Sequence, residues 1–483
     1  MRILLDTNII IPLEDSSTVL AESLGKLVKL ANENGHQLLI HPASIEDLNR
    51  DKDKERRRIS VSRIQKYTAL IAPPTFTDSD REKLKLSETS DNDRIDNLII
   101  FALYKNAVNL LITEDREIHK KAAKLGIDER VHYIQQAASS LEILHSKFHV
   151  DLPNIDELSL HQINLSSSFF DSLRKSYPGF DNWYNDASMS GRRAWVHLDG
   201  AGHLGAIAIY KVESSPIVTD NNTGLPGNVL KLCTFKVGES LRGRKIGELL
   251  LKASFRYATV NQLTSIYLTM RPDEQPYLAD LCEDFGFKEF GEHKDDFVYV
   301  KDHPVSPPNL RIDPFLFHQR YYPHFNSDEN VSKYIVPIRP EFHTILFPDI
   351  QQQGSLFISG TAGNAIKQAY LCHAKLAGIR PGDLLLFYRS KDQKAITSIG
   401  VVEQIADTQD KDKILELVSK RTVYSYEDIL SMAEKQTKVL LFRLAKHLDE
   451  TKEYQWLLDN NIVRGQIQTI RRISDDSFRK IIS

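Results

Sequence analysis

The sequence predicts an α/β protein built from several domains. Its 483 residues exceed the usual size of one domain. Two proline-containing connections, around Pro153 and from Pro304 to Pro308, divide the chain into thirds. Strand-like runs alternate with helical stretches in the first third, and the other two thirds contain neighbouring strand-like runs. We therefore expect three domains, at residues 1–145, 160–302 and 310–483.

Composition is that of an ordinary soluble globular protein, with 41% hydrophobic and 26% charged residues. No apolar stretch reaches membrane-spanning length and no secretory signal pattern is visible, so we expect a cytoplasmic protein without a membrane partner. The three cysteines lie far apart, so any metal site would use oxygen ligands. A net charge of -3 creates no global positive field, and nucleic acid would have to bind local patches.

The first third repeats a strand–helix pattern. The apolar runs RILL, QLLIHP and NLLIT are typical of buried strands. Helical spacing is seen in the four stretches 17–34, 43–58, 96–105 and 116–125. This alternation predicts a parallel, Rossmann-like sheet with helices on its faces.

Four carboxylates lie beside these apolar runs. Asp6 and Asp115 directly follow strands, Asp47 follows the second strand, and Asp96 begins a helical stretch. Open α/β sheets carry their chemistry at the carboxyl ends of strands. Carboxylates gathered there repel one another until a cation arrives, and Mg²⁺ or Mn²⁺ prefers such oxygen ligands. The four acids therefore predict a metal site that activates a water against a phosphodiester.

The segments LLDTN, PASIEDL, DNLIIFA and LITED resemble the PIN-domain nucleases over about residues 1–140. The resemblance implies that Asp6, Asp47, Asp96 and Asp115 are the catalytic and metal-binding residues. It also implies a nuclease acting on RNA or DNA.

Other acids compete for these roles. Glu46 precedes Asp47, Glu114 precedes Asp115, and Asp93 lies three residues before Asp96 on the same helix face. Each acid taken singly also fits a helix cap or a first-turn position, where negative charge is favourable.

The middle third begins with antiparallel strands. RRAWVHLD and LGAIAIYKVE flank a glycine turn, and VLKLCTFKV is a third strand. LRGRKIGELLLKASFRYA then leads through a turn rich in glycine and arginine into a helix. Backbone N–H groups at such a helix start can hold a pyrophosphate.

This region resembles the GNAT acetyltransferases over about residues 165–302. Arg242–Gly247 matches both ends of their pyrophosphate loop, and SIYLTM and EDFGFKEFG match their closing elements. The resemblance implies acetyl coenzyme A, with the amides of Gly243, Lys245 and Gly247 around the pyrophosphate and the strand at Phe235–Val237 along the pantetheine arm. The residues implied to bind the cofactor are Phe235, Val237, Arg242, Gly243, Arg244, Lys245 and Gly247.

Two positions depart from the family pattern. Lys245 stands where the family commonly has a glycine, and Cys282 stands where a tyrosine often protonates the departing thiolate. Tyr277 is the nearest phenol, and we assign no general acid. The acceptor amine, on a protein, a small molecule or an aminoacylated RNA, is left open.

The last third predicts a small mixed barrel. PGDLLLFYRS, ITSIGVVEQI and KVLLFRLAKHL are strand-like, and helices are expected at Ala365–Leu376 and Tyr426–Lys435. This pattern, with FISG before it, resembles the PUA-like superfamily of the ASCH and EVE type, which implies binding of RNA or modified bases. Aromatic candidates for a base pocket are Phe357, Tyr388, Tyr424 and Tyr426, and candidates for phosphate contact are Arg421, Arg471 and Arg472.

Together these patterns predict a metal-dependent endoribonuclease joined to an acetyl-CoA-dependent N-acetyltransferase and an RNA-recognition module. Such a chain fits a toxin-like or stress-response effector. The alternative is an N-acetyltransferase whose flanking domains serve only RNA or partner binding. Four retained acids favour the first hypothesis, and the pyrophosphate turn supports the acetyltransferase in both.

Overall fold

The computed structural model describes residues 1–10, 19–49, 57, 64, 67–145, 154–241, 243–348, 350, 361–362, 365–421 and 424–483. Its contacts divide the chain into two compact units. Unit 1 comprises Met1–Val150, Arg242–Arg244 and Asp407–Val439, and unit 2 comprises Asp151–Leu241, Lys245–Ala406 and Leu440–Ser483. None of the helices in the described ranges is long and apolar enough to cross a membrane.

Unit 1 contains a five-stranded sheet in which every pair of neighbouring strands is parallel. The strand order is β3-β2-β1-β4-β5, so β1 and β4 lie side by side where the order of winding reverses. The predicted parallel sheet is confirmed. The strands are β1 (Arg2–Leu5), β2 (Gln37–Ile40), β3 (Thr68–Ala69), β4 (Leu110–Ile112) and β5 (Val131–His132).

Helices connect these strands. The connecting segments are helical because their apolar residues recur on one face, which packs into the core. In α6 (Asp91–Tyr104), Ile95, Ile99 and Leu103 follow this spacing and are buried in the core with Leu4 of β1. The other helices are α1 (Thr7–Ile10), α2 (Val19–Glu33), α3 (Pro42–Asn49), α5 (Asp78–Leu84), α7 (Arg116–Leu125), α8 (Ile134–His145), α16 (Lys411–Val418) and α17 (Tyr426–Ala433).

An eight-stranded sheet forms the first half of unit 2. Its order is β11-β12-β10-β9-β8-β7-β6-β14, and only β9 and β10 pair in parallel among the strands described here. The strands are β6 (Asn154–Ser159), β7 (Arg193–Leu198), β8 (Leu204–Ser214), β9 (Asn228–Val237), β10 (Ser265–Met270), β11 (Lys288–His293), β12 (Asp296–Asp302) and β14 (Thr361–Ala362).

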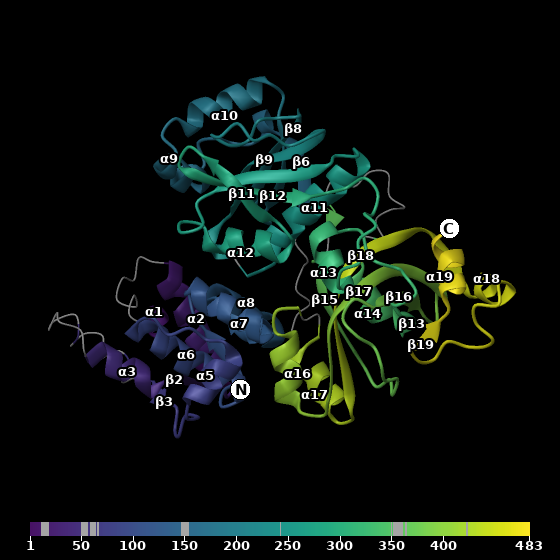
Figure 1. Cartoon of the computed structure of the whole chain (residues 1–483), viewed down its shortest axis with the longest axis horizontal. Helices are drawn as coiled ribbons and strands as arrows, with labels where there is room; N and C mark the ends of the chain where they lie inside the picture. The colour runs from purple at the N-terminus through teal and green to yellow at the C-terminus, as the bar shows by residue number, and fades with distance from the viewer. Residues whose placement is uncertain are drawn as a thin grey trace. The chain divides into compact units, whose positions relative to one another are not determined.

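Helices cover both faces of this sheet (Figure 1). α9 (Asp171–Ser176) and α10 (Phe180–Met189) lie on one face, where α10 packs on Ile207 and Ile209 of β8. α11 (Ile246–Val260) and α12 (Pro276–Asp284) cover the other face, where Ala206 and Ala208 of the same strand point. The alternation along β8 follows from the two-residue period of a strand.

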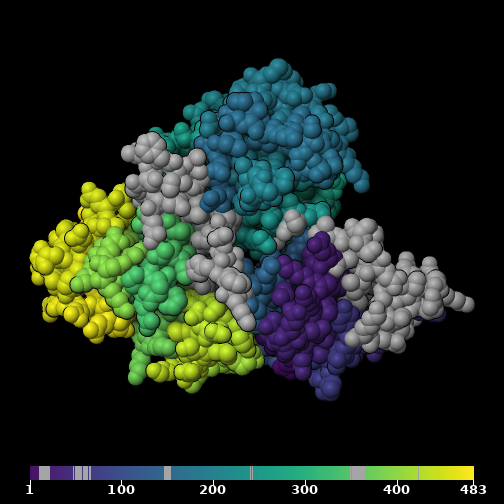
Figure 2. Space-filling view, turned by 180° about the vertical axis from the view of Figure 1, so that it is seen from behind, coloured from purple at the N-terminus to yellow at the C-terminus, as the bar shows by residue number. Residues whose placement is uncertain are grey.

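The second sheet of unit 2 has six strands in the order β15-β18-β17-β16-β13-β19. Its strands are β13 (Lys333–Ile338), β15 (Lys367–Cys372), β16 (Leu384–Arg389), β17 (Ala395–Thr408), β18 (Thr437–Glu453) and β19 (Arg471–Ile473). Three of its helices are α14 (Pro340–Leu346), α18 (Tyr454–Asp459) and α19 (Asp475–Ile482). The C-terminal helices lie in the yellow surface region of Figure 2.

The helix predicted over Ala365–Leu376 is wrong, because Lys367–Cys372 is the edge strand β15. Its apolar spacing fits a helix, but pairing with β18 satisfies the backbone in an extended conformation. The helix predicted from Tyr426 is confirmed as α17.

The two sheets of unit 2 share a core. Tyr322, which follows α13 (Pro314–Tyr321), and Ile366, which precedes β15, are buried among the residues of α11, α12 and β10. The Tyr322 hydroxyl donates a hydrogen bond to Leu444 O of β18 (3.1 Å). A connection rich in proline therefore does not keep the two sheets apart.

Candidate functional sites

Strands β9 and β10 diverge at their carboxyl ends. Their parallel pairing runs from Val229–Ser265 to Leu232–Leu268 and stops there, although β9 continues to Val237. On its other edge β9 stays paired with β8 up to Val237, with Cys233 bulged out of register. The predicted cofactor residues Phe235 and Val237 thus lie on a strand segment that has lost its neighbour on the β10 side. Such an edge offers backbone groups to an extended ligand.

Helix α11 begins beside this edge. An ideal Cβ on Gly247 would lie 2.9 Å from Leu281 Cδ2 and 3.7 Å from Val237 Cγ2, so glycine permits close packing of α11 on β9 and α12. The residue before the helix, Lys245, adopts φ +58° and its side chain does not cap the helix. The first N–H groups of α11 are left without that cap, as an anion site requires.

Lys245 and Glu248 turn toward β15 in unit 2. Lys245 Nζ donates to Lys367 O (3.0 Å), and Glu248 Oε1 accepts from Lys367 N (2.6 Å). The lysine that replaces the expected glycine therefore uses its side chain for a contact within unit 2. Sequence reasoning missed both Glu248 and Lys367, because Glu248 resembles an ordinary first-turn acid and Lys367 fell in a predicted helix.

The other residues of the predicted loop are placed differently. Gly243 (φ +84°) packs within unit 1 against the start of α8, where a Cβ would lie 2.8 Å from Gln135 O. Arg244 Nη2 is 3.5 Å from Glu142 Oε2 in the same unit. Arg242 lies outside the described residues.

Cys282 does not replace the family's tyrosine as a proton donor. It is fully buried in the core of unit 2, and burial raises the pKa of its thiol. Tyr277 lies one helical turn before Leu281 on α12, the residue that contacts Gly247.

In unit 1, Asp6 is buried at the end of β1, with 5% of the residue exposed. Thr113, which follows β4, donates to Asp6 Oδ2 (2.7 Å), and Thr7 N donates to Asp6 Oδ1 (2.7 Å). Burial raises the pKa of Asp6 and the charge of Asp115 adds to the rise, while the hydrogen bonds from Thr113 and Thr7 oppose it. The sequence signal for Thr113 was its place directly after a strand.

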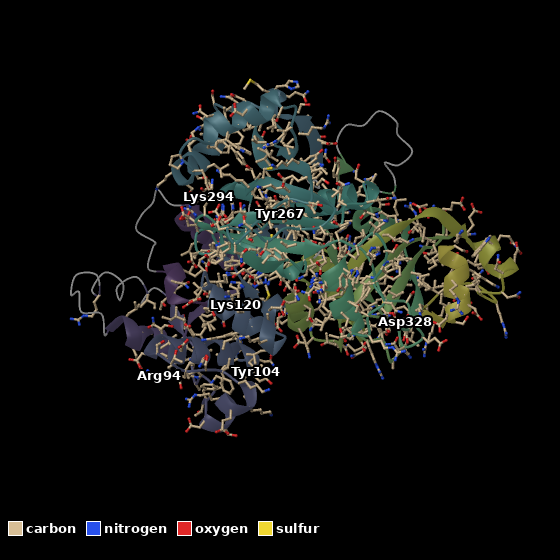
Figure 3. All side chains as sticks on the ribbon, turned by 45° about the horizontal axis from the view of Figure 1, so that its top comes forward. Arg94, Tyr104, Lys120, Tyr267, Lys294 and Asp328 are labelled. Carbon is tan, nitrogen blue, oxygen red and sulfur yellow. The ribbon has the colours of Figure 1, made fainter. Side chains whose placement is uncertain are left out.

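Asp96 completes a group of interacting acids. Burial, assisted by the charges of Asp115, Asp6 and Asp93, raises the pKa of Asp96 to about 7 against the opposing charge of Lys121. Lys121 Nζ lies 3.6 Å from Asp96 Oδ2 and 3.5 Å from Asp93 Oδ1. Lys121 belongs to α7, whose position in Figure 3 is shown by the label of the neighbouring Lys120.

Two of the three competing acids, Glu114 and Asp93, have structural tasks. Glu114 Oε1 accepts from Ile134 N at the start of α8 (3.0 Å), and Asp93 accepts hydrogen bonds from Thr89, which lower its pKa to about 2. Asp115 itself caps α7 by accepting from Glu117 N (2.7 Å).

The structure therefore brings Asp6, Asp96 and Asp115 near one another at the switch point of the sheet. Asp47 lies on α3, and its side chain is outside the described residues. Among the side chains that are described, no group of three acids, histidines or cysteines is placed to hold a metal ion. As they stand, Lys121 and the hydroxyl groups supply the partners that a cation would supply, so these acids do not by themselves fit Mg²⁺ or Mn²⁺.

The aromatic residues predicted for a base pocket that the structure describes belong to different units. Tyr388 is buried in the core of the second sheet of unit 2, whereas Tyr424 and Tyr426 belong to unit 1. Phe357 lies outside the described residues. Arg421 is buried and forms an ion pair with Glu129 in unit 1, so the phosphate contact predicted for it is wrong.

Comparisons with known proteins bear on the middle third of the chain. A model of the "Acetyltransferase (GNAT) family" matches residues 158–287, so this part of the chain is a GNAT acetyltransferase domain. The resemblance seen in the middle third of the sequence is thereby confirmed. A search of curated proteins found no match.

Solved structures of two kinds are similar in part. ASCH from Zymomonas mobilis shows 10% identity and a TM-score of 0.25, covering 31% of this chain and 93% of that one. A GNAT acetyltransferase from Staphylococcus aureus shows 19% identity and a TM-score of 0.23, covering 32% of this chain and 99% of that one. The GNAT family N-acetyltransferase YhbS from Escherichia coli, solved in complex with CoA, shows 13% identity and a TM-score of 0.24. The similarity covers 33% of this chain and 85% of YhbS. The family match, and not these structures, carries the assignment.

Proposed function

We propose that the GNAT domain of this chain transfers an acetyl group from acetyl-CoA to an amine. The observation that carries the proposal is the divergence of β9 from β10 after the Leu232–Leu268 pair, beside the uncapped start of α11. A strand edge next to a helix N-terminus matches the two parts of the cofactor, an amide-bearing arm and a diphosphate.

The residues present fit that cofactor. The backbone of Phe235 and Val237 would hold the pantetheine arm, and the amides of Lys245 and Gly247 would hold the diphosphate. For Arg242, Gly243 and Arg244, which are grouped with unit 1, a role in holding the diphosphate is implied by the family resemblance alone. When bound, acetyl-CoA supplies a thioester whose acetyl carbon bonds to the acceptor nitrogen as the C–S bond breaks, and the amine's proton ends on the departing sulfur.

Calorimetry with acetyl-CoA on the full chain tests this proposal. The wild type is expected to bind, and Arg242→Ala is expected to weaken binding about ten-fold, the scale of one lost charge-assisted contact. Arg256→Ala, which removes an exposed arginine of α11, is the matched control and should bind like wild type. Absence of both heat and thermal stabilisation at millimolar acetyl-CoA would overturn the proposal.

A second proposal concerns unit 1, for which we infer a PIN-type endoribonuclease that uses Mg²⁺ or Mn²⁺. It is supported by the meeting of Asp6, Asp96 and Asp115 at the switch point of a parallel sheet and by the raised pKa of Asp96. Binding of a metal ion would require Lys121 to move away from Asp96. It would also require a further ligand, for which Asp47 is the candidate from the sequence.

The test compares RNA cleavage by wild type and by the double variant Asp6→Asn, Asp96→Asn in the presence of Mg²⁺ or Mn²⁺. Cleavage is expected to disappear in the double variant while the protein stays folded, as its circular dichroism spectrum would show. The variant Glu117→Gln, on the exposed face of α7, is the control and should cleave like wild type. Equal cleavage by the double variant would contradict the nuclease proposal.

For the second sheet of unit 2 we propose a PUA-like, ASCH/EVE-type module that binds RNA. Its support is the sequence resemblance together with the arginines Arg471 and Arg472 of β19. A gel-shift assay with Arg471→Ala, Arg472→Ala should show weaker RNA binding and a shallower salt dependence, because phosphate contacts release counterions. Unchanged affinity and salt dependence would contradict this proposal.

These assays separate two functions for the whole chain. Loss of RNA cleavage in the double variant Asp6→Asn, Asp96→Asn, with acetyl transfer retained, supports an effector with two activities, such as a toxin-like or stress-response protein. Acetyl transfer and RNA binding without any cleavage support an N-acetyltransferase whose flanking domains only bind.

A further inference from the structure

A charged network joins the start of α11 to the second sheet of unit 2, and Lys367 lies at its centre. The Lys367 backbone accepts from Lys245 Nζ (3.0 Å) and donates to Glu248 Oε1 (2.6 Å). Its ammonium group lies 3.0 Å from Asp284 Oδ2 and 3.7 Å from Glu403 Oε1. One residue of β15 thus contacts both α11 and the end of α12.

Arg443 of β18 completes the network. Its Nη2 atom lies 2.6 Å from Asp284 Oδ1 and 2.9 Å from Glu403 Oε1. The guanidinium is buried between the rings of Phe285 and Phe315, at 5.1 and 5.3 Å. Three cations and three carboxylates therefore gather in this network, in which Arg443 and Glu248 are buried and the Asp284 side chain is one-third exposed. Unpaired charge is costly where such groups are buried.

This placement affects the helix end proposed to hold the diphosphate. Glu248 is the third residue of α11, so its carboxylate is a natural ligand for the same positive helix end. A carboxylate there competes with and repels a diphosphate. The contact with Lys367 N instead keeps Glu248 against β15, and the contact of Lys245 Nζ with Lys367 O holds that side chain as well.

We propose that Lys367 is a positioning residue for the acetyl-CoA site: by engaging Glu248 and Lys245, it keeps the start of α11 available to the cofactor's diphosphate. The inference rests on the proposed acetyltransferase function and extends it, because it makes cofactor affinity depend on a residue of β15, outside the matched GNAT region. Its ammonium group acts by anchoring the backbone of β15 through Asp284 and Glu403.

The test is a binding cycle on the full chain, with acetyl-CoA measured by calorimetry. Lys367→Met is expected to weaken acetyl-CoA binding about ten-fold, the scale of one charge at a partly buried helix terminus. Glu248→Gln alone should bind acetyl-CoA as tightly as wild type or more tightly. The double variant should regain wild-type affinity within about two-fold, because the competing carboxylate is gone. Lys288→Met, at an exposed lysine of β11, is the control.

A merely structural role of Lys367 would not give this rescue, since Glu248→Gln repairs no lost packing. Should Lys367→Met fail to fold, Glu248→Gln decides alone: it should bind acetyl-CoA at least as tightly as wild type does, and its affinity for S-acetylpantetheine, which lacks the diphosphate, should equal that of wild type. Unchanged binding by Lys367→Met, no rescue in the double variant, or weaker binding by Glu248→Gln would overturn the inference. Wild type that binds no acetyl-CoA would instead overturn the proposed function itself.

Discussion

Arg443 Nη2 lies 2.6 Å from Asp284 Oδ1, so a buried guanidinium of β18 pairs with a carboxylate at the end of α12. Burial by itself raises the pKa of Asp284, but Arg443 and Lys367 outweigh it and hold the pKa below its usual value. The pair ties the GNAT domain to the second sheet of unit 2.

Breaking this pair should destabilise unit 2. Arg443→Met removes one of the two cations that Asp284 and Glu403 contact. Losing a buried partner costs about 3–5 kcal/mol in comparable cases, and the loss here should be smaller because Lys367 remains and Asp284 is one-third exposed. Arg320→Met is the matched control, because Arg320 and its partner Asp302 are each about half exposed, and such pairs contribute at most about 1 kcal/mol. Urea unfolding measures both, and equal losses would contradict the importance of the buried pair.

Gly286 permits the close approach of α13 to the turn that follows α12. Its φ is +84°, and an ideal Cβ would lie 2.5 Å from Gln319 O. Gly286→Ala should therefore cost more than Gly378→Ala, whose φ of +90° is similar but whose Cβ would meet no described atom within 4 Å. The control should lose about 1–3 kcal/mol from backbone strain alone. The same free energy of unfolding for both variants would show that the contact with Gln319 has no energetic effect.

Lys301 should make stability depend on pH above neutrality. Burial lowers its pKa from 10.5 to about 7, and its Nζ donates to Arg320 O (2.7 Å). Between pH 7 and 10.5 the unfolded chain binds this proton and the folded chain does not, so stability rises with pH across that window. In Lys301→Met this contribution is absent. Chemical unfolding near pH 7.5 and pH 9 should show that the free energy of unfolding of wild type rises with pH and that of Lys301→Met does not. An equal change with pH in both proteins would contradict the lowered pKa of Lys301.

Asp96 should have the opposite effect in unit 1. Its folded pKa is raised from 3.8 to about 7, so the folded chain holds the extra proton between these values and stability falls as pH rises through them. Asp96→Asn removes the fall and should be more stable than wild type at pH 8. Glu117→Gln should leave the fall above pH 4.5 unchanged, because its contact with Lys120 lowers the pKa of Glu117 below that range. A wild-type profile retained in Asp96→Asn would contradict the raised pKa.

Local sequence patterns correctly predicted the strands and helices that bury either one face or their whole surface. Apolar runs such as RILL and SIYLTM became the strands β1 and β10 because a buried strand needs a short apolar run and little else. Segment Lys367–Cys372 was predicted wrongly because its spacing suits both a helix and a strand, and pairing with β18 decides between them. That information lies about 70 residues away in the chain.

The same reason limited the prediction of the sites. Asp6 could be singled out because it directly follows a recognisable strand, whereas Phe235 was named through the resemblance to the GNAT acetyltransferases. The buried pairing of Arg421 with Glu129, and of Lys367 with Glu248, joins segments far apart in sequence, and no local pattern marks either partner. The charged side chains therefore resembled solvated ones, although the fold buries them.

Hydrogen exchange with and without acetyl-CoA tests the central claim most directly, because the proposed site is made of backbone groups. Saturating acetyl-CoA should protect the amides of β9 from Cys233 to Val237 and those at the start of α11. The amides from Val229 to Leu232, where β9 has its strand neighbours on both sides, should exchange as before. Protection confined to any other part of the chain, or none at all, would contradict an acetyl-CoA site between β9 and β10.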